Sequence, residues 1–298
     1  MMEGREAVLP GATSSSPPPG GLKRAVFAVR KKWIWIPLAA LVIWTVAPLL
    51  IAVSVSLKER AEVFASPQLI PDSPTLEAYV TTLSRPAFRV AFLNSVVVGA
   101  GTTALTLALS IPAAYVFARF RLPLRHLLLL LILLPRLVPT LGLMVPLYRL
   151  AVTLGALNST LTLIMVLTGT IIPFSIWLMT GFFEQIPVEL EEAAAVDGAN
   201  TWQRVRRVVL PIALPAMITV GALAFREAWI EFDLVLALTT TAEARTLPYE
   251  LFLLSEVTGL PNYPVEAAFA ILTTVPLVLV YLLFERQVIS GLTSGALK

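Results

Sequence analysis

Four ionisable residues lie in otherwise apolar runs of the sequence: Arg136, Arg226, Glu227 and Glu231, with Trp229 among them. A charge at the depth of a bilayer costs at least about 2.5–3.5 kcal/mol, so such a side chain must face protein or water. Glu227 and Glu231 share one face of a helix, whereas Arg226 points about 100° away from Glu227. One hypothesis is that these residues line a polar route. The alternative is that they lie near an interface or pair across helices to fix packing, and the sequence leaves both open.

The residue types that most catalytic sites require are missing. There is no cysteine, and the single histidine, His126, stands beside basic residues where a solvated position is expected. None of the lysines lies in a G-x-x-x-x-G-K-[ST] phosphate loop, so the sequence shows no nucleotide-binding motif of this kind. Neither H-E-x-x-H nor G-x-S-x-G occurs. We therefore expect a non-catalytic protein with no cofactor and no metal.

The composition is that of a chain that lies mostly in a bilayer. Of 298 residues, 57% are hydrophobic and only 14% are charged, with a mean hydropathy of +0.83. A soluble domain averages about 25% charged residues, and an apolar run of about 20 residues can cross a membrane as a helix. We predict an all-α polytopic membrane protein whose transmembrane domain, residues 33–290, contains six helices, at residues 33–54, 90–117, 127–148, 161–183, 212–232 and 267–284.

The two ends of the chain and the basic residues predict its orientation. Residues 1–32 begin with a Pro-, Ser- and Gly-rich stretch and are expected to form a disordered cytoplasmic tail, and residues 291–298 a cytoplasmic C-terminal tail. Six spans place both termini on one side, and Lys and Arg are more abundant in the segments assigned to the cytoplasm. These basic residues flank spans and are not interleaved with aromatic residues, which argues against nucleic-acid binding.

Residues 186–211, IPVELEEAAAVDGANTWQRVRRVVLP, interrupt the apolar second half of the chain. A proline suits the first turn of a helix, and the following glutamates lie near that helix's positive end. Gly198 can end the helix because glycine enters the left-handed region without penalty. Asn200 or Thr201 can cap a second short helix, which Pro211 would close. A helical loop of residues 184–211 is therefore predicted between two spans.

This loop resembles the EAA loop of ABC-importer permeases, because Glu-Ala-Ala is followed by Asp-Gly-Ala and then by Leu-Pro. The sequence ELEEAAAVDGA is similar to that of the carbohydrate branch of this family, the maltose-permease-like second membrane subunits. The resemblance implies a cytoplasmic coupling helix that docks into a cleft on an ATPase subunit. The coupling residues that it implies are Glu191, Glu192, Ala193, Ala194, Asp197, Gly198, Ala199, Leu210 and Pro211. The alternative is an ordinary amphipathic loop whose acidic residues only cap a helix.

Other fragments carry the same resemblance from about Trp33 to the C-terminus. Ala113-Ala114-Tyr115, Pro146-Leu147-Tyr148 and Thr246-Leu247-Pro248 follow the wording of the carbohydrate branch in order. One departure lies in the fifth predicted span, where Trp229-Ile230-Glu231-Phe232 stands in place of the usual Trp-Asn-Glu-Phe. The polar second position of that motif is lost.

The resemblance implies the permease subunit of an ATP-driven importer that forms half of the translocation pathway for a sugar or sugar-like solute. Its implied partners are a second permease subunit in a heterodimer, two ABC ATPase subunits and an extracytoplasmic solute-binding protein, in a bacterial-type inner membrane. Arg136, Arg226, Glu227, Trp229 and Glu231 are the candidate residues of the translocation path. The alternative is an ion-coupled secondary transporter or channel that uses Glu227 and Glu231 as coupling carboxylates. The sequence does not identify the solute.

Overall fold

The computed structural model describes residues 21–65, 68–257 and 261–294, and within these ranges it is helical, with no β-strand. The all-α prediction is confirmed. The principal helices are α1 (Gly21–Ser56), α2 (Arg60–Ala65), α3 (Glu77–Ser84), α4 (Pro86–Arg119), α5 (Arg125–Leu133), α6 (Thr140–Thr153), α7 (Thr160–Gln185), α8 (Glu189–Val196), α9 (Thr201–Arg204), α10 (Leu210–Ile230), α11 (Asp233–Leu238), α12 (Leu247–Val257) and α13 (Tyr263–Ser294).

The first helix is longer than the predicted first span. α1 contains the apolar stretch Trp35–Ser56, which is long enough to cross a membrane, but it begins at Gly21. Residues 21–32, which were expected to belong to a disordered tail, are therefore helical, because alanine, leucine, lysine and arginine there favour extension of the helix. The rest of that predicted tail, residues 1–20, and residues 295–298 of the predicted C-terminal tail lie outside the described residues.

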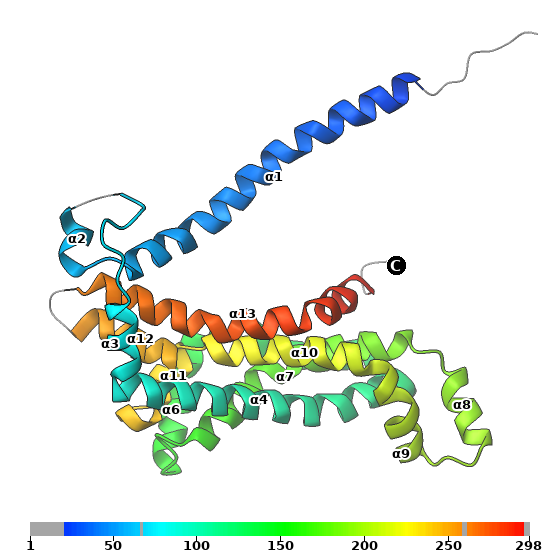
Figure 1. Ribbon diagram of the computed structural model, residues 1–298. Helices are drawn as coiled ribbons and strands as arrows, with labels where there is room; N and C mark the ends of the chain where they lie inside the picture. Colours follow the sequence, from blue (N-terminus) through cyan, green and yellow to red (C-terminus); the bar gives the residue numbers. More distant parts are fainter. Residues whose placement is uncertain (1–20, 66–67, 258–260, 295–298) are drawn as a thin grey trace, which may run out of the picture. The chain divides into compact units, whose positions relative to one another are not determined.

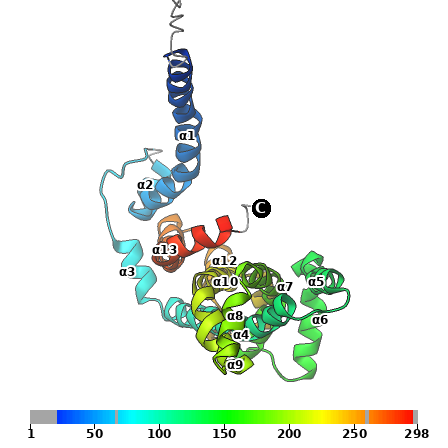
Figure 2. The ribbon, with the colours of Figure 1, turned by 90° about the vertical axis from the view of Figure 1, so that its right-hand side faces the viewer.

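Four long helices, α4, α7, α10 and α13, form the main bundle of the second part of the chain and run side by side (Figures 1 and 2). The predicted spans at 90–117 and 161–183 fall inside α4 and α7. α8 and α9 project from one end of this bundle, whereas α3, α11 and α12 lie at the other end (Figure 1). We refer to these as the α8 end and the α11 end.

The predicted third span is not one helix. α5 is followed by a 3₁₀ turn, η1 (Leu134–Leu137), and then by α6. The segment Arg125–Leu137 and the segment Thr140–Thr153 meet at a bend of 86°. Pro139 is responsible, because a proline disfavours the helical region for the residue before it, and Val138 is accordingly extended at φ −76°, ψ 123°. The described residues thus contain five helices that could span a membrane, and a sixth span if the bent pair is counted.

Small residues allow the helices of the bundle to approach closely. A Cβ added at Gly101 on α4 would lie 2.5 Å from Ile164 Cδ1 on α7, and one at Gly221 on α10 would lie 3.3 Å from Leu107 Cδ1. Small side chains at helix interfaces are a common means of packing in membranes, where the hydrophobic effect between helices is weak. The main bundle therefore rests on close contact of α4 with α7 and α10.

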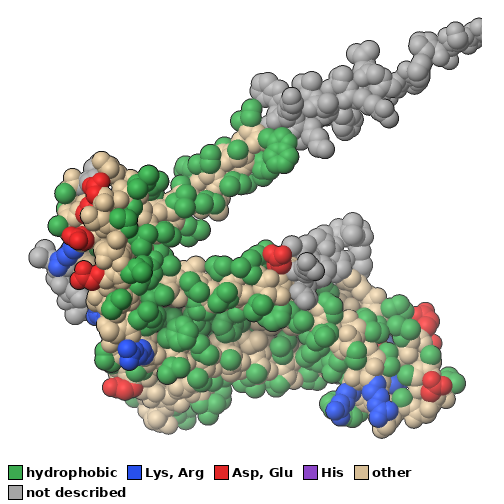
Figure 3. Space-filling model, viewed as in Figure 1, with side chains coloured by type: hydrophobic (Ala, Val, Ile, Leu, Met, Phe, Trp, Pro, Cys, Tyr) green, Lys and Arg blue, Asp and Glu red, His purple; other side chains and the backbone are tan. Residues whose placement is uncertain are grey.

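The distribution of charge agrees with a membrane-spanning bundle. On the face shown in Figure 3, apolar side chains cover the flank of the bundle, and most Lys, Arg, Asp and Glu side chains lie toward its two ends. Large apolar residues of α4 and α13, such as Leu93, Leu109 and Leu279, are exposed. Such a surface suits contact with lipid or with other membrane helices.

Candidate functional site

The bend between α8 and α9 is built by Gly198. This residue has φ 85°, in the left-handed region. Its N–H donates to the carbonyl of Ala195 at 3.0 Å, and the N–H of Ala199 donates to the carbonyl of Ala194 at 2.9 Å. These two bonds make a Schellman ending, which satisfies carbonyls that the last turn of a helix leaves free. The predicted glycine bend is confirmed.

The second helix of the loop starts as predicted but does not end as predicted. Asn200 caps it: its side chain accepts a bond from the N–H of Gln203 at 2.9 Å, and the side chain of Gln203 accepts one from the N–H of Asn200 at 3.0 Å. The chain then continues through a π-helical turn, η2 (Val205–Val209), into α10. Pro211 therefore does not close the helix, because it falls in the first turn of α10, where the π turn accommodates its missing N–H.

Glu191 faces the bundle, although it belongs to the acidic first turn of α8. Glu191 is only 3% exposed. The hydroxyl of Tyr115 donates to Glu191 Oε2 at 2.7 Å, and Arg119 Nε donates to Oε1 at 2.6 Å. Arg119 Nη2 also donates to the carbonyl of Ile186 at 2.9 Å. α8 is thereby fastened to the end of α4 by charge-assisted hydrogen bonds, the stronger kind.

The opposite side of α8 is exposed. Glu192, Ala193 and Val196 are exposed, and Val196 is 88% exposed. Trp202 on α9 is 67% exposed. Val196 and Trp202 are therefore candidates for contact with another molecule. The remaining predicted loop residues, Asp197, Gly198 and Pro211, are exposed as well, whereas Ala194, Ala199 and Leu210 are half-buried.

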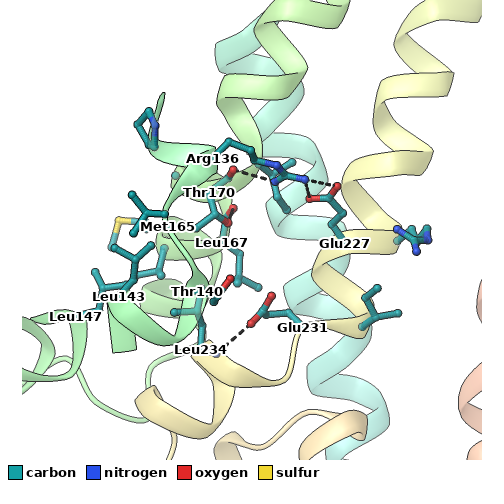
Figure 4. A pocket seen from close by; sticks show the side chains of 17 residues that line it. Arg136, Thr140, Leu143, Leu147, Met165, Leu167, Thr170, Glu227, Glu231 and Leu234 are labelled. Carbon is teal, nitrogen blue, oxygen red and sulfur yellow. Dashed lines mark hydrogen bonds and ion pairs between the residues drawn. The ribbon is translucent and has the colours of Figure 1, made fainter. Parts of the chain in front are cut away.

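The charges predicted within the spans gather around one cavity toward the α11 end of α10. This cavity has a volume of about 560 Å³, and its wall includes Arg136, Arg226, Glu227 and Glu231 (Figure 4). η1, α6, α7, α10 and α11 contribute to the lining, so the break in the predicted third span makes one side of the cavity. A volume of this size is within the usual range of about 300–1,000 Å³ for small-molecule sites.

Arg136 and Glu227 pair across the cavity. Arg136 Nη2 lies 2.6 Å from Glu227 Oε1 and 2.7 Å from Oε2, and Nη1 donates to the carbonyl of Thr170 at 3.1 Å. The guanidinium carbon also lies 5.8 Å from the centre of the Phe174 ring. The pair is partly open to the cavity, with side-chain exposures of 37% and 27%. The structure therefore contains both the cross-helix pairing and the polar lining that the sequence left as alternatives.

Two further predicted residues of this group, Glu231 and Trp229, differ in placement. Glu231 follows the last residue of α10, and its Oε1 accepts a bond from the N–H of Leu234 at 3.0 Å, so it caps α11 while lining the cavity. Trp229 does not line the cavity. It is 1% exposed, donates from Nε1 to the carbonyl of Thr273 at 3.1 Å and stacks on Phe225. Its placement assigns Trp229 to the core and does not support a role in the path.

Sequence reasoning did not assign roles to Tyr115 and Arg119. Tyr115 stands in a fragment that resembles the family, but the approach of both residues to Glu191 depends on how α4 and α8 meet, which periodicity does not give. Arg125 and Glu184 were missed for the same reason: they form an ion pair between the start of α5 and the end of α7. The signal in the sequence is that basic residues stand at the end of α4 and the start of α5, whereas acidic residues stand at the end of α7 and in the loop that follows it.

Comparison with known proteins identifies relatives of this chain. Residues 107–292 match the family model described as binding-protein-dependent transport system inner membrane component. The sulfoquinovosyl glycerol transport system permease protein SmoH of Agrobacterium fabrum is 37% identical over 244 residues, which cover 82% of this chain and 85% of the relative. The trehalose transport system permease protein SugB of Mycobacterium tuberculosis is 34% identical over 274 residues, covering 90% and 98%.

The same fold occurs in a solved structure. A chain of a bacterial ABC transporter involved in the import of the acidic polysaccharide alginate superposes with a TM-score of 0.77 at 21% identity, covering 91% of this chain and 99% of that chain. A second structure, of the alginate transporter with a pentasaccharide-bound periplasmic protein, gives a TM-score of 0.62 over 86% of this chain. At this identity, the likeness concerns the fold.

Proposed function

Since this chain belongs to the family of binding-protein-dependent transport system inner membrane components, we propose that it is the permease subunit of an ATP-driven importer for a sugar or sugar-like solute. The family that the sequence resembled is confirmed by the match over residues 107–292. The observation that carries the proposal is the loop of α8 and α9, which is held at the bundle by Glu191 and turns Glu192 and Val196 outward.

The outward face of α8 and α9 is the docking surface for a separate ATPase subunit. We define this surface by the exposed residues Glu192, Ala193, Val196 and Trp202. Ala193 leaves room for close approach of another backbone, and Val196 and Trp202 provide apolar area that water now covers. The chain has no phosphate-binding lysine of its own, so the energy of ATP must reach it through such a contact.

The orientation in the membrane follows from this assignment. The α8 end faces the cytoplasm, as do both termini, and the α11 end faces the outside of a bacterial inner membrane. A solute-binding protein delivers the solute there, and the name of the family includes that partner. A second permease chain supplies the other half of the pathway, and two ATPase subunits complete the assembly.

The cavity at Arg136 and Glu227 belongs to the solute route. Its wall combines two guanidinium groups, two carboxylates and the hydroxyl-bearing Thr140 and Thr170 with leucine and methionine side chains. Sugars need planar donors and acceptors for their hydroxyls and apolar contacts for their C–H faces, and this wall provides both. The relatives that transport trehalose and sulfoquinovosyl glycerol support a sugar-like solute.

The reading as an ion-coupled transporter is not retained. A coupling carboxylate must exchange a proton or a metal ion during transport. Glu227 is instead neutralised by Arg136, and Glu231 is engaged in capping α11.

The proposed function is tested by transport with the chain in its full assembly. The chain is reconstituted in proteoliposomes with a second permease, the ATPase subunits and a solute-binding protein from the same organism. Uptake of radiolabelled trehalose and of a sulfonated sugar glyceride should require internal ATP and persist with an ionophore. Val196→Asp should abolish copurification of the ATPase, because it places a charge in the apolar part of the docking surface. Uptake without ATP that the ionophore abolishes would contradict the proposal.

A further inference from the structure

We propose that Tyr115, Arg119 and Glu191 form a clamp that transmits movement of the ATPase-contacting loop to α4, and that these are positioning residues rather than partner contacts. The inference rests on the proposed function, because it concerns what happens after an ATPase has gripped α8. It divides the two adjacent glutamates of the loop: Glu192 faces the partner, and Glu191 faces the permease's own spans.

The contrast between these neighbours is the first observation. Glu191 is 3% exposed and is held by two side chains of α4, whereas Glu192 is exposed. A buried carboxylate requires partners, since water no longer compensates its charge. Here Arg119 supplies the opposite charge at 2.6 Å and Tyr115 a second donor at 2.7 Å. Glu191 therefore cannot serve the docking surface while this arrangement lasts.

The length of α8 is the second observation. The helix has eight residues, and a helix of that length is not stable in isolation. Its position must be set by tertiary contacts. Arg119 provides two of them, because it bonds both to Glu191 inside α8 and to the carbonyl of Ile186 just before it. One guanidinium thus fixes both the start of the loop and the helix that follows.

The third observation is the packing of α4 against its neighbouring helices beyond the clamp. Arg119 is the last residue of α4, and α4 packs closely on α7 at Gly101 and on α10 at Gly221. The second ion pair, between Arg125 and Glu184, ties α5 to the end of α7 at the same end of the bundle. A displacement of α8 is therefore delivered to packed helices and not absorbed by a mobile loop. Networks of packed and hydrogen-bonded groups carry coupling in this way.

The test compares matched variants of the full assembly in proteoliposomes, with three readouts: ATPase copurification, ATP hydrolysis and solute moved per ATP hydrolysed. Glu191→Ala should keep the ATPase bound and hydrolysis active, while the solute moved per ATP falls about tenfold. Glu191→Gln should retain most of the ratio, since its amide oxygen can still accept from Arg119 while its amide nitrogen donates to the hydroxyl oxygen of Tyr115. Arg121→Ala, an exposed arginine two residues beyond the clamp, should behave as the wild type.

The three side chains should also act as one unit. Tyr115→Phe and Arg119→Lys each remove part of the clamp, and their effects on the ratio should be less than additive with those of Glu191→Ala. If Glu191→Ala does not accumulate, Tyr115→Phe and Arg119→Lys decide the question, because each keeps the bulk of the side chain. An unchanged ratio in both would overturn the clamp, and so would loss of ATPase copurification in Glu191→Gln. A failure of the proposed function would be recognised by a different result: the ATPase would then copurify with Val196→Asp as well.

Discussion

Arg136 and Glu227 are 91 residues apart, and one guanidinium nitrogen of Arg136 lies 2.6 and 2.7 Å from the two carboxylate oxygens of Glu227. The pair joins η1, the break in the third predicted span, to α10. It therefore joins two of the elements that line the cavity that we propose as part of the solute route. Because both side chains are partly exposed to that cavity, a solute can reach them.

Removal of either member should impair transport. Arg136→Ala leaves a carboxylate without its counter-charge in apolar surroundings, and Glu227→Ala leaves the guanidinium in the same position. We expect uptake to fall at least tenfold in each, and the free energy of unfolding to fall by about 1–2 kcal/mol, since the pair is only partly buried. The double exchange Arg136→Glu with Glu227→Arg should recover part of both. Unchanged uptake and solute range in both single variants would exclude these residues from the route.

At Gly198 the backbone conformation, and not the space around the residue, should decide which side chains are tolerated. A Cβ there meets nothing within 4 Å, but φ is 85°, which costs about 1–2 kcal/mol for an ordinary L-residue. Gly198→Ala should lower ATPase copurification and uptake, whereas Gly198→Asn, which enters the left-handed region more readily, should lose less. Gly181→Ala is the control: it lies in α7, also in open space, with no positive φ. Equal effects of Ala and Asn at 198 would argue against the bend as the cause.

Gly101 should be restricted by space. Its added Cβ would lie 2.5 Å from Ile164 Cδ1, so Gly101→Val should force α4 and α7 apart and destabilise the protein by about 1–3 kcal/mol. The measurement is the thermal unfolding midpoint in detergent. Ile164→Ala should restore part of the loss by making room. Gly142→Val, at a position with nothing within 4 Å, should leave the midpoint close to that of the wild type. A midpoint unchanged in Gly101→Val would show that the helices are less tightly packed than described.

The parts of the fold that depend on local chemistry could be predicted from the sequence. The glycine bend follows from the cost of a left-handed backbone, and the Asn200 cap follows from the free N–H groups at a helix start. The long apolar helices follow from the length needed to cross a bilayer. In each case, the residues that decide the structure are neighbours in the chain.

The predictions that were wrong or missing concern positions where local effects compete, or where residues far apart in the sequence meet. Pro139 breaks the third predicted span, residues 127–148, which was expected to be one helix, because its effect on Val138 adds to the 3₁₀ turn before it. Pro211 was expected to end a helix, but its place in a first turn makes it harmless. The opposite fates of Glu191 and Glu192 could not be read from their identical side chains, because they depend on which face of α8 meets α4.

The most direct test of the central claim, that α8 turns its outward face to a separate ATPase, uses the absence of cysteine from this chain. Val196→Cys introduces a single thiol at a position that is 88% exposed, and Ile70→Cys introduces one in the loop between α2 and α3 that is 78% exposed. The assembly is treated with a short bifunctional thiol reagent, with one cysteine placed at the rim of the ATPase cleft. We predict a cross-linked permease–ATPase product for Val196→Cys and none for Ile70→Cys. A product with Ile70→Cys, or labelling of Val196→Cys by a membrane-impermeant maleimide added outside intact cells, would contradict the account.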